Sequence, residues 1–179
     1  MRRSAVLLVV LLSAGLLRSF SQSVESADTG RLSVTAGGFV SGFRPGQDNH
    51  TLIGGGTFVD VHLSHWVQIE AEGRWLEWNQ YYGQHEENYL IGPRVPIKHF
   101  RRSQLYGKAL IGLGKETFPF GYGYGSFTAL AFGGTYEYRL SRRLTLRAVD
   151  FEYQYWPKWL NNQSLSPYGV STGLGYRIF

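Results

Sequence analysis

The chain is 179 residues long, the size of one domain, and its 23 glycines and 16% aromatic content favour a β-protein with many turns. It contains no cysteine, which excludes a disulfide framework and thiolate chemistry. The net charge is +5, but three arginines near the N-terminus account for most of that excess, so the remainder gives no reason to expect nucleic-acid binding.

Residues 1–23 have the order of regions found in a secretory signal peptide. Two arginines open the chain, an apolar run extends from Ala5 to Leu17, and small residues follow around Ser21. The apolar run is shorter than the roughly 20 residues that a membrane-spanning helix needs. We predict an exported protein with a signal peptide over residues 1–23 and one domain over residues 24–179; a retained membrane anchor is the alternative.

Eight segments beyond residue 30 have the alternating pattern of β-strands, with turn residues between them. In the fourth segment Pro93 and Pro96 cannot donate to a strand ladder, so we expect a bend or bulge near its end. In the first, second and sixth segments the alternation is weaker, because four phenylalanines fall on the otherwise polar face: Phe39, Phe43, Phe58 and Phe127. The segments are Leu32–Phe43, Leu52–Leu63, Trp66–Trp78, Glu87–Ile97, Arg102–Gly114, Tyr124–Leu140, Leu144–Trp156 and Pro167–Phe179.

The seventh segment shows the alternation most plainly, between Val149 and Trp156. Apolar or aromatic side chains alternate there with Asp150, Glu152 and Gln154, so one face of the strand is apolar and the other is polar. In a soluble sandwich the apolar face would form the core. In an outer-membrane barrel it would contact lipid, and the charged face would line the lumen.

The connections between segments favour the barrel. Those after the first, third, fifth and seventh segments are long, including residues 79–86, and those after the second, fourth and sixth are short. Outer-membrane barrels have an even number of strands, short periplasmic turns and longer external loops. We therefore predict an all-β, eight-stranded antiparallel up-and-down transmembrane barrel.

Aromatic residues gather near the predicted strand ends, as the interfacial girdles of a barrel would require. Those beside the long loops include Trp75, Trp78, Tyr122, Tyr155, Trp156 and Trp159, and those beside the short turns or the C-terminus include Trp66, Phe100, Tyr138, Tyr176 and Phe179. The core of a soluble sandwich would draw such residues toward the middle of the strands.

The predicted inward face carries charges of both signs. An eight-stranded barrel is only wide enough for its own side chains, so these charges must pair to be tolerated inside it. We predict that they form a network that closes the lumen. The residues are Asp60, Glu70, Glu72, Arg74, Arg94, Lys108, Glu137, Arg139, Asp150 and Glu152.

The signal peptide, the eight alternating segments and the C-terminal aromatic residue resemble the OmpA/OmpX-like family of outer-membrane β-barrels, including its opacity-type members. Members of that family commonly end in an aromatic residue that the barrel-assembly machinery recognises. The chain ends in Leu174-Gly175-Tyr176-Arg177-Ile178-Phe179, so the resemblance implies an assembly signal at Tyr176 and Phe179. The sequence ends at Phe179, so we expect a barrel-only member without the periplasmic domain of full OmpA-type proteins, and the resemblance implies an outer-membrane location.

Some barrels of this size modify lipid A, so hydrolytic chemistry needs consideration. The run His62-Leu63-Ser64-His65 supplies a hydroxyl and a base, but it lies at a predicted turn, where these residue types are common. The run His85-Glu86-Glu87 lies in a predicted loop and lacks ligand spacing. Gly114-Lys115-Glu116 lacks the Ser or Thr of a phosphate-binding loop. Residues 121–125 are most simply a loop tip, with an aromatic ligand platform as the alternative.

We therefore predict a monomeric barrel without cofactor, metal or enzymatic activity, with a structural or surface-interaction role. Its expected partners are outer-membrane lipids and the barrel-assembly machinery. Anionic headgroups would meet the basic residues of two short turns, Lys98, Arg101, Arg102, Arg142 and Arg143. The alternatives are a small diffusion pore, a lipid A-modifying enzyme, and a soluble exported barrel with an apolar interior for ligands.

Overall fold

A computed structural model describes residues 32–46, 50–118, 120, 123–157 and 163–179. The predicted signal peptide lies outside the described residues, as do Tyr122 and Trp159 of the predicted aromatic girdle. Among the residues that are described, no helix has the length and apolar character needed to cross a membrane.

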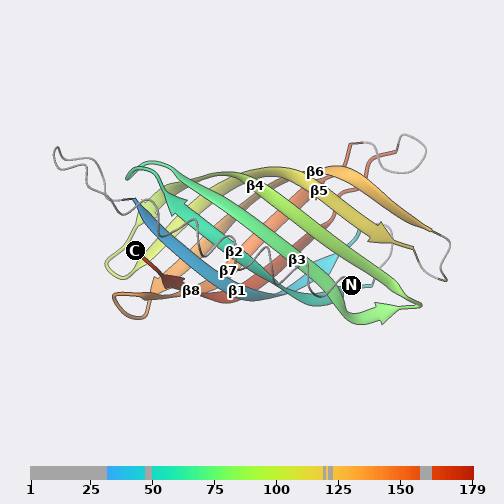
Figure 1. Ribbon diagram of the computed structural model, residues 1–179, viewed down its shortest axis with the longest axis horizontal. Helices are drawn as coiled ribbons and strands as arrows, with labels where there is room; N and C mark the ends of the chain where they lie inside the picture. Colours follow the sequence, from blue (N-terminus) through green and yellow to red (C-terminus); the bar gives the residue numbers. More distant parts are fainter. Residues whose placement is uncertain (1–31, 47–49, 119, 121–122, 158–162) are drawn as a thin grey trace, which may run out of the picture.

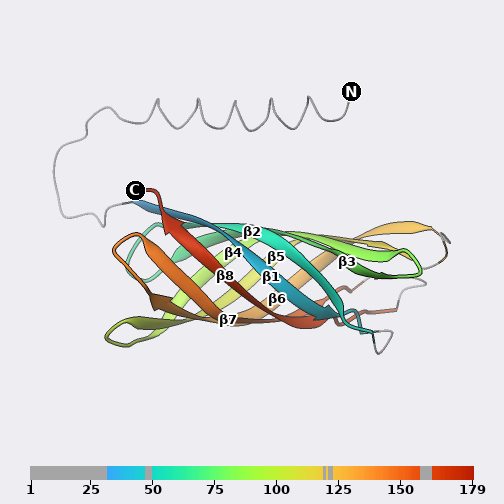
Figure 2. The same ribbon diagram turned by 90° about the horizontal axis from the view of Figure 1, so that it is seen from below.

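Eight antiparallel strands form one closed barrel, in which each strand pairs with its neighbours in the sequence. β1 also pairs with β8, with Gly38 opposite Leu174, and this pairing closes the barrel. The start of β1 and the end of β8 lie at the same end as the β2–β3, β4–β5 and β6–β7 turns (Figures 1 and 2). The predicted eight-stranded up-and-down barrel is confirmed. The strands are β1 Ser33–Arg44, β2 Leu52–His62, β3 Gln68–Tyr81, β4 Gln84–His99, β5 Ser103–Thr117, β6 Tyr124–Arg139, β7 Leu144–Tyr155 and β8 Tyr168–Arg177.

The predicted long loop over residues 79–86 is wrong. β3 and β4 continue to Tyr81 and Gln84, which pair across a two-residue turn. The turn residues Tyr82 and Gly83 have φ angles of 50° and 83°, the left-handed pair that gives a tight hairpin its twist. This end of the barrel therefore carries a protruding hairpin between β3 and β4 (Figure 1).

Irregularities interrupt the ladders at three places among the described residues. One lies between Leu76 and Tyr81, where the β3–β4 register shifts near the hairpin tip. The β4–β5 register shifts between Pro96 and Lys98, where the prolines predicted a bend or bulge. In β7, Glu137 of β6 is opposite Arg147 and Tyr136 is opposite Val149, so Ala148 is an extra residue. The inward-facing residues of β7 therefore change from odd to even numbers across Ala148.

The barrel is apolar outside and polar inside. Phe151 and Tyr153 are 47% and 42% exposed, whereas Asp150 and Glu152 between them are each 1% exposed. A soluble monomer rarely exposes a continuous apolar surface of this kind, whereas a transmembrane barrel presents it to lipid. Other exposed apolar side chains on the strands include Val40, Ile53, Val59, Ile91, Val95, Ile111, Leu113, Phe132, Val149, Val170 and Leu174.

Glycines on the inner wall make room for the aromatic rings of the lumen. A Cβ atom on Gly56 would lie 2.3 Å from the Phe39 ring, and one on Gly114 would lie 2.3 Å from the Trp156 ring. Trp156 is 0% exposed. It therefore fills the lumen, and its predicted place in the outer aromatic girdle is wrong.

Candidate functional site

The buried charges of the lumen are its most distinctive chemical feature. Four cationic side chains, those of Arg74, Arg94, Lys108 and Arg147, are at most 1% exposed. They face six carboxylates from β2, β3, β6 and β7, and Glu137 is the most exposed of these at 14%. The acids are Asp60, Glu70, Glu72, Glu137, Asp150 and Glu152.

Lys108 lies at the centre of the network. Its Nζ is 2.9 Å from Glu152, 3.0 Å from Asp150, and 3.2 Å from both Glu70 and Glu72. The carboxylates of Glu70, Glu72 and Asp150 are close enough together to hold a metal ion, but the ammonium group of Lys108 contacts all three. This acidic cluster is therefore the partner of a buried lysine.

Two arginines extend the network toward the end with the short turns. Arg94 lies 2.9 Å from Asp60 and 2.6 Å from Glu137, and Arg147 lies 2.9 Å from Asp60 and Glu70. Glu70 contacts both arginines as well as Lys108, so the ion pairs are joined into one network. Removing one member would leave its partners buried without a counter-charge, which is strongly destabilising.

In the opposite direction, Arg74 connects the ion pairs to a chain of uncharged donors. Arg74 lies 2.9 Å from both Glu72 and Glu152. Gln154 donates to Glu152 at 2.8 Å and accepts a hydrogen bond from the indole N–H of Trp156, also at 2.8 Å. The polar network thus ends on an aromatic side chain that blocks the lumen.

Nine of the ten residues predicted for the network belong to it, and Arg139 does not. Arg139 is exposed at the mouth of the barrel and makes no ion pair in the described part of the chain. Arg147 is the cation that the sequence analysis missed. If strict alternation continued toward Leu144, Arg147 would face lipid, which is costly for a guanidinium group. That conflict was the available sign of the bulge at Ala148.

Aromatic rings stack on the buried guanidinium groups. The Arg147 guanidinium carbon lies 3.6 Å from the centre of the Phe58 ring, that of Arg94 lies 3.8 Å from Tyr106, and that of Arg74 lies 4.0 Å from Phe43. Such contacts are favourable for a desolvated cation. They explain why phenylalanines occupy the polar face of β1 and β2, and rings there narrow the lumen further.

The half of the lumen opposite the termini holds two apolar groups beside buried polar side chains, among them Glu86 and Glu116. Trp156 packs there with Leu90, Leu110, Ala129, Ala131 and Leu165, and Phe127 stacks on Trp156 with ring centroids 5.8 Å apart. A second group joins Phe43, Leu52 and Leu76. Together with the ion pairs, these groups close the interior over most of its length.

A cavity of about 550 Å³ opens at the mouth with the short turns. Asp60, Gln68, Tyr106 and Glu137 from the lumen border it, and so do basic side chains of the rim: Lys98, Arg101, Arg102, Arg139 and Arg177. The cavity ends at Asp60 and Glu137, the carboxylates held by Arg94 and Arg147. It is therefore a vestibule and not a continuous passage.

Ser64 has a structural role in its turn. Its hydroxyl oxygen accepts hydrogen bonds from the backbone N–H groups of Trp66 and Val67, each at 3.2 Å. Ser141 accepts from the N–H groups of Arg143 and Leu144 in the same way. The serine of the possible catalytic group therefore has a counterpart in a turn that holds no histidine, which supports the turn interpretation.

Comparisons with known proteins identify the class of the fold. No protein-family model and no curated protein matches the sequence. Among solved structures, the barrel is similar to Neisserial surface protein A (NspA), with a TM-score of 0.59 at 11% identity, over 84% of this chain and 99% of that one. It is also similar to the N-terminal β-barrel domain of Pseudomonas aeruginosa OprF, with a TM-score of 0.55 at 12% identity, over 83% and 100% of the two chains.

A third similar structure is the outer membrane protein OprG of Pseudomonas aeruginosa, with a TM-score of 0.52 at 10% identity, over 85% of this chain and 98% of that one. Identities this low are informative about fold alone. The chain therefore has the fold of an eight-stranded outer-membrane β-barrel with a buried charge network in its lumen. The OmpA/OmpX-like resemblance found in the sequence is confirmed at the level of the fold.

Proposed function

We propose that this protein is a monomeric, non-enzymatic barrel of the outer membrane, with a closed lumen and a structural or surface-interaction role. The observation that supports closure most directly is the burial of Arg74, Arg94, Lys108 and Arg147 in one connected ion-pair network. An ion crossing the barrel would have to break several of these pairs, and Trp156 and its apolar neighbours block the next layer.

Recording from single barrels in planar lipid bilayers tests closure. We expect no stable open level for the wild type. A double variant, Trp156→Ala with Phe43→Ala, removes aromatic side chains from the half of the lumen opposite the termini. It retains the ion pairs, so it should also stay closed. A large and stable wild-type conductance would contradict the proposal and favour the diffusion pore.

The location and maturation of the protein are part of the same proposal. Residues 1–23 would be a cleaved signal peptide, and Tyr176 and Phe179 would serve the barrel-assembly machinery. Tyr176 and Phe179 are 49% and 63% exposed, so both side chains are accessible at the end of the barrel. Fractionation to the outer membrane with heat-modifiable migration in SDS gels would support this, and Phe179→Ala should reduce assembly. A soluble periplasmic product would contradict it.

The enzymatic alternative has a separate test. A lipid A-modifying barrel would change the mass spectrum of lipid A between deletion and overexpression strains. We expect identical spectra, because Ser64 serves its turn as an acceptor of backbone hydrogen bonds. A shifted lipid A mass that is lost in Ser64→Ala would overturn this part of the proposal.

A further inference from the structure

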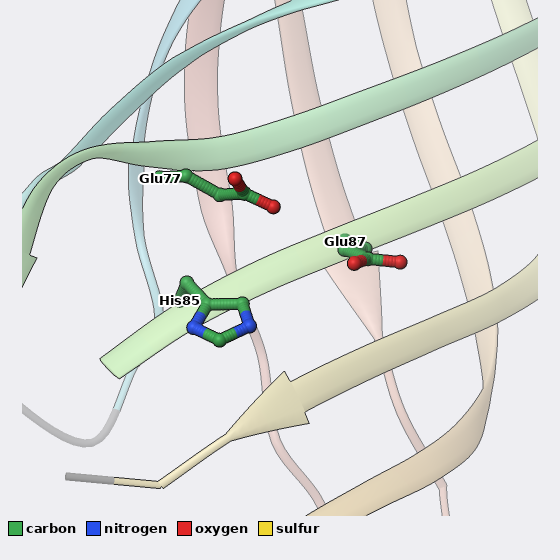
Figure 3. A group of neighbouring side chains, drawn as sticks. All are labelled: Glu77, His85 and Glu87. Atoms are coloured by element: carbon green, nitrogen blue, oxygen red, sulfur yellow. The ribbon is translucent and has the colours of Figure 1, made fainter. Parts of the chain in front are cut away.

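Three metal-ligating side chains converge on the outer face of the β3–β4 hairpin. One ligand atom from each of Glu77, His85 and Glu87 lies within 4.8 Å of the others. Figure 3 shows Glu77 on β3 and the other two residues on β4. His85 and Glu87 are two residues apart and therefore share one face of the strand, and Trp75 is opposite Glu87 in the ladder. Glu77 is distant from His85 and Glu87 in the sequence, and the pairing of Leu76 with Glu86 brings it beside them, so this cluster was not predicted from the sequence.

The ring of His85 is oriented as in a metal-binding histidine. Its Nδ1 lies 3.1 Å from the backbone carbonyl oxygen of Gly83. A carbonyl oxygen only accepts, so Nδ1 carries the hydrogen in this contact and Nε2 keeps its lone pair. Histidines that bind metals typically donate their other ring N–H to such a partner, which fixes the tautomer and the ring plane.

Glu87 also has a supporting partner. The Tyr89 hydroxyl donates to Glu87 Oε2 at 3.0 Å and accepts a hydrogen bond from the indole N–H of Trp75 at 3.0 Å. The two rings meet edge to face, with centroids 6.1 Å apart. These two consecutive hydrogen bonds hold the Glu87 carboxylate in place, as hydrogen bonds to metal-ligating carboxylates do.

The cluster lies where water and ions have access. Trp75 and Tyr89 are amphipathic aromatics of the kind found at the membrane interface, and the ionisable residues follow on the side toward the hairpin tip. His85 and Glu87 also border a hollow of about 150 Å³ on the side of β5 and β6, so water has access to these two side chains.

We propose that Glu77, His85 and Glu87 bind a Zn²⁺ ion on the β3–β4 hairpin. One imidazole nitrogen and two carboxylate oxygens suit zinc, with water in the remaining position, whereas Ca²⁺ prefers oxygen ligands alone. Zn–N and Zn–O bonds are about 2.0–2.2 Å long, so the three ligand atoms must move closer together. Glu77 is exposed and can make this movement by rotating its side chain.

Lys115 competes for the same site. Its Nζ lies 3.8 Å from Glu87 Oε2, and its side chain is 50% exposed. The ammonium group therefore partly neutralises Glu87 in the absence of metal and repels an incoming cation. Replacing it with glutamine should strengthen zinc binding, an effect opposite in sign to that of any ligand substitution.

The experiment is a calorimetric titration of the folded barrel, without an affinity tag, with ZnCl₂ in detergent micelles. We expect one saturable site per chain, weakened about tenfold or more by His85→Ala and by Glu87→Gln, and strengthened by Lys115→Gln. Tyr89→Phe should weaken binding by about tenfold, because it removes only the support of Glu87. His99→Ala, at the opposite mouth of the barrel, is the matched control and should leave binding unchanged.

Paramagnetic broadening by Co²⁺ in NMR spectra locates the ion independently of these variants. Broadening should centre on the amides of residues 77, 85 and 87 in the wild type, whose fold is not in question. Absence of saturable zinc binding would overturn the proposal. So would binding that survives His85→Ala in a variant with normal heat-modifiable migration, or broadening centred on His62, His65 and His99.

Discussion

At the residue scale, Arg147 shows how a buried charge depends on its partners. Its guanidinium group lies between Asp60 and Glu70, each 2.9 Å away, and stacks on the Phe58 ring. Arg94 and Lys108 contact the same acids but cannot neutralise all of them alone. Since Arg147 and Glu70 are at most 1% exposed, their charges are stabilised chiefly by one another and by neighbouring groups of the protein.

We therefore expect Arg147→Ala to lower the free energy of unfolding by about 3–5 kcal/mol, because it leaves buried carboxylates without a counter-charge. The matched control is Arg139→Ala, at the exposed mouth, which should change it by less than about 0.5 kcal/mol. Urea unfolding in lipid vesicles, followed by tryptophan fluorescence, measures both. Equal effects of the two substitutions would contradict the assignment of Arg147 to the network.

At the scale of the element, β7 combines an apolar outer face, a charged inner face and the bulge that aligns them. Val149 and Phe151 are 51% and 47% exposed on its outer side, and Tyr155 lies at its end. The extra residue Ala148 lets Arg147 and Asp150 face the same lumen although their numbers differ in parity. A strand without the bulge would direct Arg147 toward lipid.

A lysine scan along β7 tests this outward orientation. Val149→Lys, near the middle of the strand, should lower the free energy of unfolding in bilayers by about 2–4 kcal/mol, whereas Tyr155→Lys should lower it by only about 0–1 kcal/mol. The difference arises because hydrocarbon penalises a charge most strongly at its midplane. A flat profile would indicate that this face does not contact lipid.

At the scale of the whole molecule, the barrel reverses the usual distribution of polar and apolar groups. Nearly all the ion pairs lie inside it, and Lys115–Glu87 is an exposed exception among the described residues. Salt screens charges that water surrounds and screens buried pairs much less. The stability of the barrel should therefore depend little on ionic strength.

We expect the unfolding free energy in vesicles to change by less than about 1 kcal/mol between low salt and 1 M NaCl. The unfolding free energy of the Arg147→Ala variant should change with salt by no more than that of the wild type, because the substitution also acts inside the barrel. A loss of several kcal/mol in high salt would mean that ions reach the network, and the closed lumen would then have to be abandoned.

The alternation of residue types by itself determined the strand number, the antiparallel order and the side that faces lipid. Period-two patterning is a local property, so it is legible in a segment such as Val149–Trp156 without any knowledge of its neighbours. The same patterning predicted ten charged residues for the network, and nine of them belong to it. It failed at Arg147, because a single bulge residue changes the phase of the alternation, and its sign in the sequence is a charge at a position that strict alternation assigns to lipid.

Only the tertiary structure decided which charges pair, how far the hairpins extend and what lies beside them. Glu70 contacts three cations from three other strands, and such convergence depends on the register around the closed barrel. The cluster of Glu77, His85 and Glu87 likewise exists only because β3 and β4 continue past the membrane interface and pair there. Contacts between strands are set by closure of the sheet, a property of all eight segments together, and this is why no single stretch of sequence specifies them.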